Sequence, residues 1–302
     1  MIAAFGDHIS TILVTGSSTG IGQETALHMA RRGHHVYGAV RSPETADELK
    51  AKVTAESLPI EVIKLDLVKP ETITAAVDEI MAKSGRIDAL VNNAGIGGGQ
   101  AVEETKLDVA REIFETNYFG NVSVLRAVTP IMRRQKSGRI VTVGSLAGQV
   151  VMGCHAHYSA SKWAMEGLSE ALAMEVAEFN VRVAIVEPGC VLTPIWGKGE
   201  LPSGDTPYIN SLARLGRFFE FGLSRPAMPS DVAEAIAHAI ESDTPHFRYA
   251  VGPDAKETTA ARSKVSDDEW MEINCLQDEE FYDRMAAIVG VDYYRGELPV
   301  GD

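Results

Sequence analysis

The chain has 302 residues, 45% of them hydrophobic, and 28 basic against 42 acidic residues give it a net charge of −14. This length holds one large domain or two small ones, with enough apolar residues for a sizeable core. The acidic balance, without a basic cluster, makes nucleic acid and anionic membranes poor candidates as partners. No apolar run approaches membrane-spanning length.

The N-terminus and the cysteines indicate the compartment. The segment MIAAFGDHISTILVTG has neither a basic start nor a cleavage pattern, so we expect no signal peptide. The three cysteines, Cys154, Cys190 and Cys275, are scattered and lack metal-ligand spacing. We therefore expect no metal site and a reducing compartment, the cytoplasm.

Short strands and helices alternate along most of the chain. We expect strands over 10–16, 34–40, IEVIKLDL up to Asp66, IDALVNNAG, GRIVTVGS and VRVAIVEPG. We expect helices from the first Gly-rich turn to about Arg32, from Pro43 to about Glu56, from Pro70 to about Lys83, twice within 105–136, and around Tyr158. This rhythm predicts an α/β fold with a doubly wound parallel sheet, a Rossmann fold. Because no repeat or low-complexity linker interrupts it, we interpret residues 1–302 as a single domain.

A Gly-rich turn, Gly16-Ser17-Ser18-Thr19-Gly20-Ile21-Gly22, joins the first strand to the first helix. A doubly wound fold binds a dinucleotide pyrophosphate at this position, against the N-terminus of the helix. Such glycines also form plain tight turns, so it is the position after strand one that makes the motif specific. At the end of the third strand, Asp66 can contact the adenine or cap the next helix.

The end of the second strand bears on the choice of cofactor. In this fold an acidic side chain there bonds the ribose hydroxyls of NAD. Here the strand ends Tyr37-Gly38-Ala39-Val40-Arg41-Ser42, without a carboxylate at 39 or 40. An arginine offers a 2′-phosphate a planar, bidentate donor, so Arg41 with Ser42 favours NADP(H) over NAD(H). The alternative is an exposed arginine that merely begins a loop.

Three side chains with complementary chemistry follow in the second half of the chain. Ser145 is at the C-terminal edge of the buried strand GRIVTVGS, and Tyr158 and Lys162 lie one turn apart on an amphipathic helix. Open α/β sheets place their ligands at the carboxyl ends of strands. A phenol titrates near pH 10, and a nearby ammonium stabilises the phenolate, which makes a tyrosine a usable general acid or base. A Tyr-x-x-x-Lys pair alone is more often an ordinary helix surface, so the other motifs decide the interpretation.

The sequence resembles the short-chain dehydrogenase/reductase family, in its single-domain form with the TGxxxGIG, NNAG and YxxxK motifs. The matching residues occur in the family's order: Thr15 to Gly22, Asp66, Asn92-Asn93-Ala94-Gly95, Asn117, Ser145, Tyr158, Lys162 and Pro188-Gly189. The segment RYAVGPDA at 248–255 and the longer C-terminal part are similar to the branch that contains hydroxysteroid and retinol dehydrogenases and bacterial ketoreductases.

The resemblance implies a role for each catalytic residue. Tyr158 exchanges a proton with the substrate oxygen, and Ser145 orients that oxygen. Lys162 stabilises the tyrosinate and bonds the nicotinamide ribose, while Asn117 helps to hold a water that links Lys162 to solvent. The expected cofactor contacts are Gly16, Ser18, Thr19, Gly20, Ile21, Gly22, Arg41, Ser42, Asp66, Leu67, Asn93, Ala94, Gly95, Tyr158, Lys162, Pro188, Gly189, Val191 and Thr193. The resemblance also implies a homodimer or homotetramer, built partly from the helices at 105–136 and 157–179.

The last third of the chain is expected to hold the substrate. Residues 190–230 have Pro, Gly and aromatic residues without clean periodicity, which predicts a lid. Candidate substrate contacts are Ser145, Met152, His155, Trp196 and Phe218, although any one aromatic can equally anchor the loop to the core. The segment 230–242 predicts a helix with Ser230 as its N-cap, and HFRYAV predicts a last strand. The C-terminal extension, 253–302, carries a capping box at Ser266 and a second short helix ending near Gly290.

Together these features predict an NADP(H)-dependent oxidoreductase that interconverts a ketone or aldehyde and an alcohol. The substrate should be a small and fairly apolar molecule. The alternatives are an NAD(H)-dependent alcohol dehydrogenase of the same family and a non-enzymatic dinucleotide-sensing regulator, which should lack the tyrosine, lysine or serine. An epimerase or dehydratase of the extended form of the family is disfavoured, because its glycine turn is usually GxxGxxG.

Overall fold

The computed structural model describes residues 10–197 and 206–296, and its strands form one parallel sheet in the order β3-β2-β1-β4-β5-β6-β7. The strands are β1 Thr11–Thr15, β2 His35–Val40, β3 Ile60–Lys64, β4 Ala89–Asn92, β5 Gly138–Val143, β6 Val181–Pro188 and β7 Arg248–Val251. The predicted doubly wound fold is confirmed. Because the strand order reverses between β1 and β4, the carboxyl ends of these two strands flank a crevice where such sheets bind ligands.

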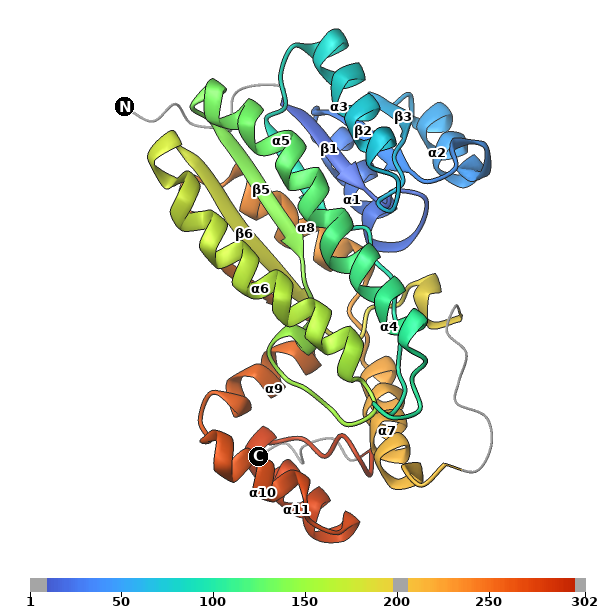
Figure 1. Ribbon diagram of the computed structural model, residues 1–302, viewed down its shortest axis with the longest axis vertical. Coiled ribbons are helices and arrows are strands. Elements are labelled where there is room, and N and C mark those ends of the chain that lie inside the picture. Colours follow the sequence, from blue (N-terminus) through green and yellow to red (C-terminus); the bar gives the residue numbers. More distant parts are fainter. Residues whose placement is uncertain (1–9, 198–205, 297–302) are drawn as a thin grey trace.

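Helices cover both faces of the sheet (Figure 1). They are α1 Gly20–Arg31, α2 Asp47–Glu56, α3 Pro70–Ser84, α4 Leu107–Phe114, α5 Asn121–Gln135, α6 Ala156–Val176, α7 Ile209–Ser224, α8 Pro229–Glu241, α9 Pro253–Arg262, α10 Asp267–Asn274 and α11 Asp278–Val289. Side chains alternate along a strand, so Ile12 and Val14 pack with α1 and α8 while Leu13 packs with α3 and α5 on the other face. Burial on both faces explains why the central strands are almost wholly apolar.

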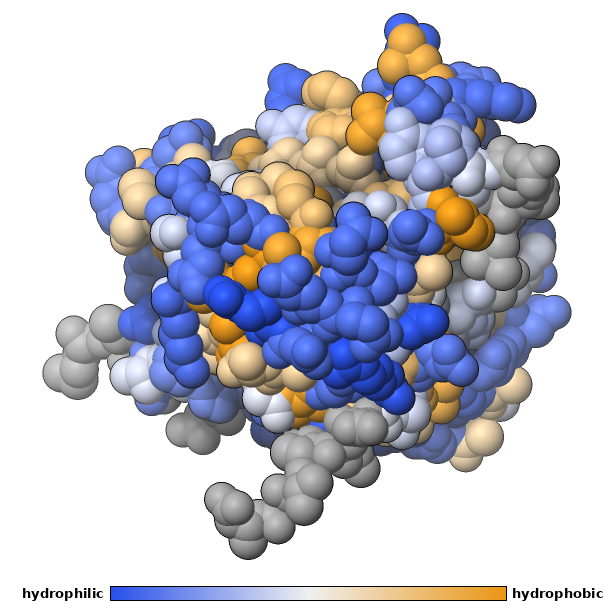
Figure 2. Space-filling model, turned by 90° about the horizontal axis from the view of Figure 1, so that it is seen from below, coloured by the Kyte–Doolittle hydropathy of each residue, from blue (hydrophilic) through white to orange (hydrophobic). Residues whose placement is uncertain are grey.

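The C-terminal extension packs against the lid region. Phe218 and Phe221 of α7 share a core cluster with Trp270, Phe281 and Tyr294 of the extension. Figure 1 shows α7 beside α9, α10 and α11 at the lower end of the molecule. Seen from that end, the middle of the surface is largely hydrophilic (Figure 2), because the aromatic side chains of the extension point inward.

Several element predictions need correction. Strand β3 ends at Lys64 rather than Asp66, and Met228, not Ser230, is the N-cap of α8, which begins at Pro229. The carboxylate of Asp231, at the third helical position, accepts a hydrogen bond from the Met228 N–H at 2.8 Å, which is one half of a capping box.

The lid was predicted without regular structure, yet its second half forms the 16-residue helix α7. Glycine and paired phenylalanines obscured the helical period in the sequence. The remainder of the predicted lid lies partly at 198–205, outside the described residues. Helix α9 was not predicted either, whereas α10 and α11 follow the expected capping box and Gly290 stop. None of the helices in 10–197 and 206–296 has the length and apolarity to cross a membrane.

Candidate active site

The Gly-rich turn between β1 and α1 forms a cradle without side chains. Gly20 has a φ of +61°, a conformation that side chains rarely adopt. A Cβ at Gly22 would overlap the carbonyl oxygen of Gly16 and the amide of Asn93. Helix α1 has no acidic residue in its first turn, and its N-cap Thr19 makes no side-chain capping bond. The N–H groups at this end can therefore bind an anion such as a pyrophosphate.

Thr15 joins the Gly-rich turn to the NNAG segment, a contact that the sequence motif did not predict. Its Oγ1 accepts hydrogen bonds from the backbone N–H groups of Asn93, at 2.9 Å, and Ala94, at 3.0 Å. The Asn93 side chain donates to the Thr15 carbonyl oxygen at 2.8 Å. These bonds hold the ends of β1 and β4 together across the crevice. The sequence signal was a buried threonine directly before the glycines.

Ser145, Tyr158 and Lys162 lie near the carboxyl end of β5. Ser145 follows that strand, and its Oγ accepts a hydrogen bond from the Ala147 N–H at 3.2 Å. Tyr158 and Lys162 occupy one face of α6, with Lys162 Nζ 5.7 Å from the centroid of the Tyr158 ring. Lys162 is buried, and its ammonium donates to the Val143 carbonyl oxygen at 3.0 Å. The end of β5 and the helix α6 therefore carry a hydroxyl, a phenol and an ammonium to the same end of the sheet.

Asn117 lies in a π-helical segment, Glu115–Gly120, which widens the helix between α4 and α5. Its Nδ2 donates to the Ile96 carbonyl oxygen at 2.9 Å and to Ser161 Oγ at 3.1 Å, and its Oδ1 accepts from the Ile96 N–H at 2.8 Å. Both side-chain donors are thus in use. π-bulges of this kind occur frequently at functional sites.

Gly95 and Ser161 complete the surroundings of Asn117. A Cβ at Gly95 would lie 3.0 Å from Asn117 Oδ1 and 3.9 Å from Lys162 Nζ, so a larger residue would crowd the space between them. Ser161 Oγ donates to the Tyr158 carbonyl oxygen at 2.7 Å while it accepts from Asn117. Ser161 was not predicted, and its signal was a small polar residue on the buried face of α6.

The residues expected near the adenosine lie at the ends of β2 and β3. The Ser17 N–H donates to the Ala39 carbonyl oxygen at 3.0 Å, which joins the end of β2 to the Gly-rich turn. Arg41, two residues further on, is exposed and has no ion pair among the described residues. Ser42 is partly buried beside it.

Asp66 and Leu67 follow β3. Asp66 does not cap α3, whose N-cap is Lys69; instead its Oδ1 accepts from the Val68 N–H at 3.2 Å. The capping alternative is therefore wrong, and the other carboxylate oxygen lies 3.9 Å from Lys69 Nζ. Leu67 is buried, against the backbone of Gly120.

A buried carboxylate holds the loop after β6. Asp254 Oδ2 accepts a hydrogen bond from the Cys190 N–H at 2.6 Å, and a Cβ at Gly189 would overlap the same carboxylate. Burial raises the pKa of Asp254. The loop then brings Thr193 to the Gly-rich turn, where the Thr193 Cβ would lie 3.3 Å from a Cβ at Gly20. The Pro188–Thr193 segment thus borders the same crevice, and only the tertiary structure shows Asp254 behind it.

The predicted substrate contacts separate into two groups. His155 stacks on Tyr158, with ring centroids 4.7 Å apart, and Phe219 joins His155 to Trp196 by edge contacts. Met152 packs partly buried beneath them. Phe218 faces the other way, stacked on Tyr293 at 4.9 Å and buried in the extension. Phe219 therefore replaces Phe218 as the phenylalanine of α7 beside the site.

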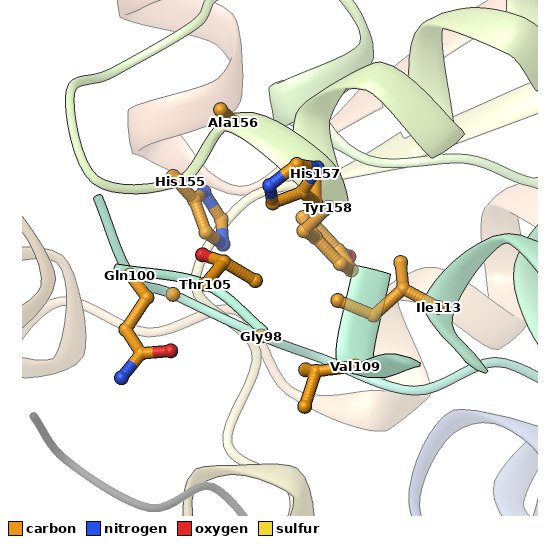
Figure 3. A pocket seen from close by; sticks show the side chains of 10 residues that line it. Gly98, Gln100, Thr105, Val109, Ile113, His155, Ala156, His157 and Tyr158 are labelled. Carbon is orange, nitrogen blue, oxygen red and sulfur yellow. The ribbon is translucent and has the colours of Figure 1, made fainter. Parts of the chain in front are cut away.

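A small pocket of about 30 Å³ lies beside Tyr158 (Figure 3). Its lining comprises Gly98, Gly99, Gln100, Thr105, Val109, Ile113, His155, Ala156, His157 and Tyr158. Burial lowers the pKa of His155 to about 4, so this imidazole is neutral at pH 7. The pocket thus combines an uncharged imidazole with aliphatic side chains of α4.

Comparisons with known proteins agree with this geometry. A family model described as short chain dehydrogenase matches residues 10–201. The chain is 34% identical over 270 residues to the 3-ketodihydrosphingosine reductase of Bacteroides thetaiotaomicron, covering 88% of this chain and 94% of that protein. It is 35% identical over 258 residues to retinol dehydrogenase 8 of Bos taurus, covering 79% and 80%. The solved structure of a short-chain dehydrogenase from Streptomyces avermitilis has a TM-score of 0.79 at 34% identity, over 88% of this chain and 96% of that one.

Proposed function

Because the chain belongs to the short-chain dehydrogenase family, whose members are oxidoreductases acting on CH–OH groups with a nicotinamide cofactor, we propose that it interconverts an apolar ketone or aldehyde and an alcohol with NADP(H). One observation carries the proposal. Tyr158 and Lys162 lie one turn apart on α6, beside Ser145, at the end of the sheet where the Gly-rich turn leaves a cradle for the cofactor.

The residues of the crevice fit a dinucleotide. Side chains are excluded at Gly22 and Gly95, and the N-terminus of α1 can bind the pyrophosphate. Asp66 and Leu67 would border the adenine, and Pro188, Gly189, Val191 and Thr193 the nicotinamide side. When bound, the cofactor supplies or accepts a hydride at the substrate carbon.

The protein's own contribution is orientation and proton transfer. In the reducing direction, the Ser145 hydroxyl donates a hydrogen bond to the carbonyl oxygen, and the Tyr158 hydroxyl gives that oxygen its proton as the carbon receives the hydride. The Lys162 ammonium, held by the Val143 carbonyl oxygen, stabilises the tyrosinate that remains. Asn117, in the π segment Glu115–Gly120, helps to hold a water that links Lys162 to solvent, and the tyrosine regains its proton along this path.

Arg41 supports NADP(H) over NAD(H). It lies two residues beyond the strand end that touches the Gly-rich turn, and positions 39 to 42 hold no carboxylate that would repel a 2′-phosphate. Its guanidinium has no ion pair within the described part of the chain, so a phosphate would not have to displace an internal partner. Ser42 adds a hydroxyl beside it.

A mostly apolar substrate is supported by the walls of the site. Val109 and Ile113 line the pocket beside Tyr158, and Phe219 contacts both His155 and Trp196. The two relatives described above are named for 3-ketodihydrosphingosine and retinol, both hydrocarbon-rich molecules. We further propose a single domain in which 190–230 acts as the substrate lid. We also propose assembly into a homodimer or homotetramer and a cytoplasmic location.

The test is a panel of ketones, aldehydes and secondary alcohols of increasing chain length, followed by the absorbance of NADPH and NADH at 340 nm. We expect turnover with NADPH that rises with apolar chain length. A protein that binds NADPH but turns over no member of the panel, with either cofactor, would contradict the proposal.

A further inference from the structure

The pocket beside Tyr158 fixes the ring of His155 in place. The imidazole stacks on the Tyr158 ring at 4.7 Å with an interplanar angle of 21°, and Phe219 meets it edge-on at 5.6 Å. A Cβ at Gly99 would lie 3.7 Å from His155 Cδ2, so the loop backbone is also close to this ring. Figure 3 shows His155 and Tyr158 together at this pocket. The ring therefore keeps a defined orientation relative to the phenol that exchanges the proton.

The two nitrogens of this imidazole have different surroundings. His155 is the N-cap residue of α6, and its Nδ1 is buried without a hydrogen-bond partner in the described structure. Its Nε2 also has no hydrogen bond to any described residue, but it is not among the enclosed atoms. Nε2 is therefore the nitrogen that a ligand in the pocket can reach.

The position of the ring decides which nitrogen carries the proton. A neutral imidazole has one N–H donor and one lone pair. His155 is the N-cap residue of α6, where unpaired backbone N–H groups and the helix dipole create a positive potential, and Nδ1 is the ring nitrogen nearer to the backbone. That potential favours the lone pair on Nδ1 and the proton on Nε2. His155 therefore presents an uncharged Nε2–H donor to the pocket.

We propose that His155 Nε2–H binds a second oxygen of the substrate, so that the preferred substrates are ketones or alcohols with a hydroxyl or keto group on the carbon next but one to the reacting carbon. Because the imidazole and phenol rings stack with their centroids 4.7 Å apart, two substrate oxygens bound by these two side chains should be only a few bonds apart. The aliphatic side chains of Val109 and Ile113 suit the hydrocarbon part of such a molecule. This inference rests on the proposed function of the same site.

The experiment compares two ketones that differ only in the second oxygen, decan-3-one and 1-hydroxydecan-3-one, or the same pair at the chain length that the ketone panel favours. The readout is the ratio of kcat/KM for the hydroxyketone to that for the plain ketone, with NADPH. A ratio cancels any general loss of activity that a substitution causes. In the wild type we expect a ratio of about ten, as a buried hydrogen bond typically gives.

Three substitutions locate the donor. The side-chain amide of His155→Gln reaches about where Nε2 lies and should keep a ratio well above one. The shorter amide of His155→Asn reaches about where Nδ1 lies, and His155→Phe keeps the ring without a donor, so both ratios should fall close to one. His246→Phe, at an exposed histidine outside the pocket, is the control and should leave the ratio unchanged.

The outcomes separate the two proposals. A wild type that reduces both ketones equally well, or a His155→Phe protein that keeps the wild-type ratio, overturns the role of His155 while the oxidoreductase function stands. A wild type that turns over neither these ketones nor the panel overturns both proposals together.

Discussion

Arg248 on β7 forms an ion pair with Glu166 on α6, the helix that carries Tyr158 and Lys162. The same guanidinium donates to Glu187 Oε1 on β6 at 2.8 Å, and the Gln149 amide donates to that oxygen at 2.9 Å. Arg248 therefore connects α6, β6 and, through Gln149, the loop that follows Ser145. One cation is shared by two buried carboxylates, an arrangement sensitive to pH.

Glu166 should make the stability of the protein depend on pH. Burial first, and then the charge of Glu187, raise the pKa of Glu166 to about 7, against the opposing effect of Arg248. The folded state binds this proton more tightly than the unfolded state does. The resulting stabilisation of the fold is therefore fully present below about pH 4.5, and it is lost as the pH rises through about 7. Between pH 5 and pH 8, the free energy of unfolding should fall by roughly 1–3 kcal/mol more in the wild type than in Glu166→Gln.

Denaturant unfolding at several pH values measures this difference. Glu170→Gln is the matched control, because Glu170 is an exposed partner of the same guanidinium at 3.6 Å. Its pH dependence should follow that of the wild type. Parallel curves for wild type and Glu166→Gln would show that Glu166 is ionised throughout this range.

Tyr158→Phe should lower kcat by about 10²- to 10⁴-fold while the protein still binds NADPH, since the ring stays and only the proton donor is lost. Lys162→Ala should impair both kcat and cofactor affinity. Steady-state assays with the best ketone of the panel measure kcat, and titration followed by NADPH fluorescence measures the cofactor affinity. Tyr118→Phe, at a half-buried tyrosine with no hydroxyl hydrogen bond in the described structure, is the control. Turnover of Tyr158→Phe near the wild-type rate would remove Tyr158 from the mechanism.

Arg41→Ala should lower kcat/KM with NADPH at least tenfold and change the value with NADH little, because a hydrogen bond to a charged group is worth roughly 1.5–3 kcal/mol. The comparison needs steady-state kinetics with both cofactors. Arg31→Ala removes a surface arginine that pairs with Glu56, and it should affect neither cofactor. Equal losses with NADPH and NADH, or a wild type that prefers NADH, would show that Arg41 does not select the phosphate.

We expect a dimer or tetramer at micromolar concentration. Phe119 and Trp163, on the segment 105–136 and on α6, are 50% and 51% exposed, and small residues such as Ala160 and Ala164 lie beside Trp163 along α6. Covering such side chains with a second copy would remove apolar surface from water. Trp163→Glu should therefore shift sedimentation toward the monomer, whereas Met271→Glu, at an exposed methionine of the extension, should not. A wild-type monomer would contradict the prediction.

The sequence by itself determined the sheet and the main parts of the site. Strands such as TILVT and GRIVTV are apolar because both of their faces are buried, and helices between them allow only a parallel sheet. The Gly-rich turn could be assigned because backbone geometry at Gly20 and Gly22 tolerates little else. Tyr158 and Lys162 could be paired because helical spacing is a local property.

Only the tertiary structure decided which distant groups complete the site. Asp254 lies 64 residues beyond Cys190 and contacts its backbone because β7 delivers α9 behind the loop after β6. Phe218 and Phe219 are neighbours in the sequence, yet the direction of α7 turns one into the extension and the other toward His155. These orientations depend on packing between elements that are far apart in the chain. A local sequence pattern does not indicate which side of a helix will contact which partner.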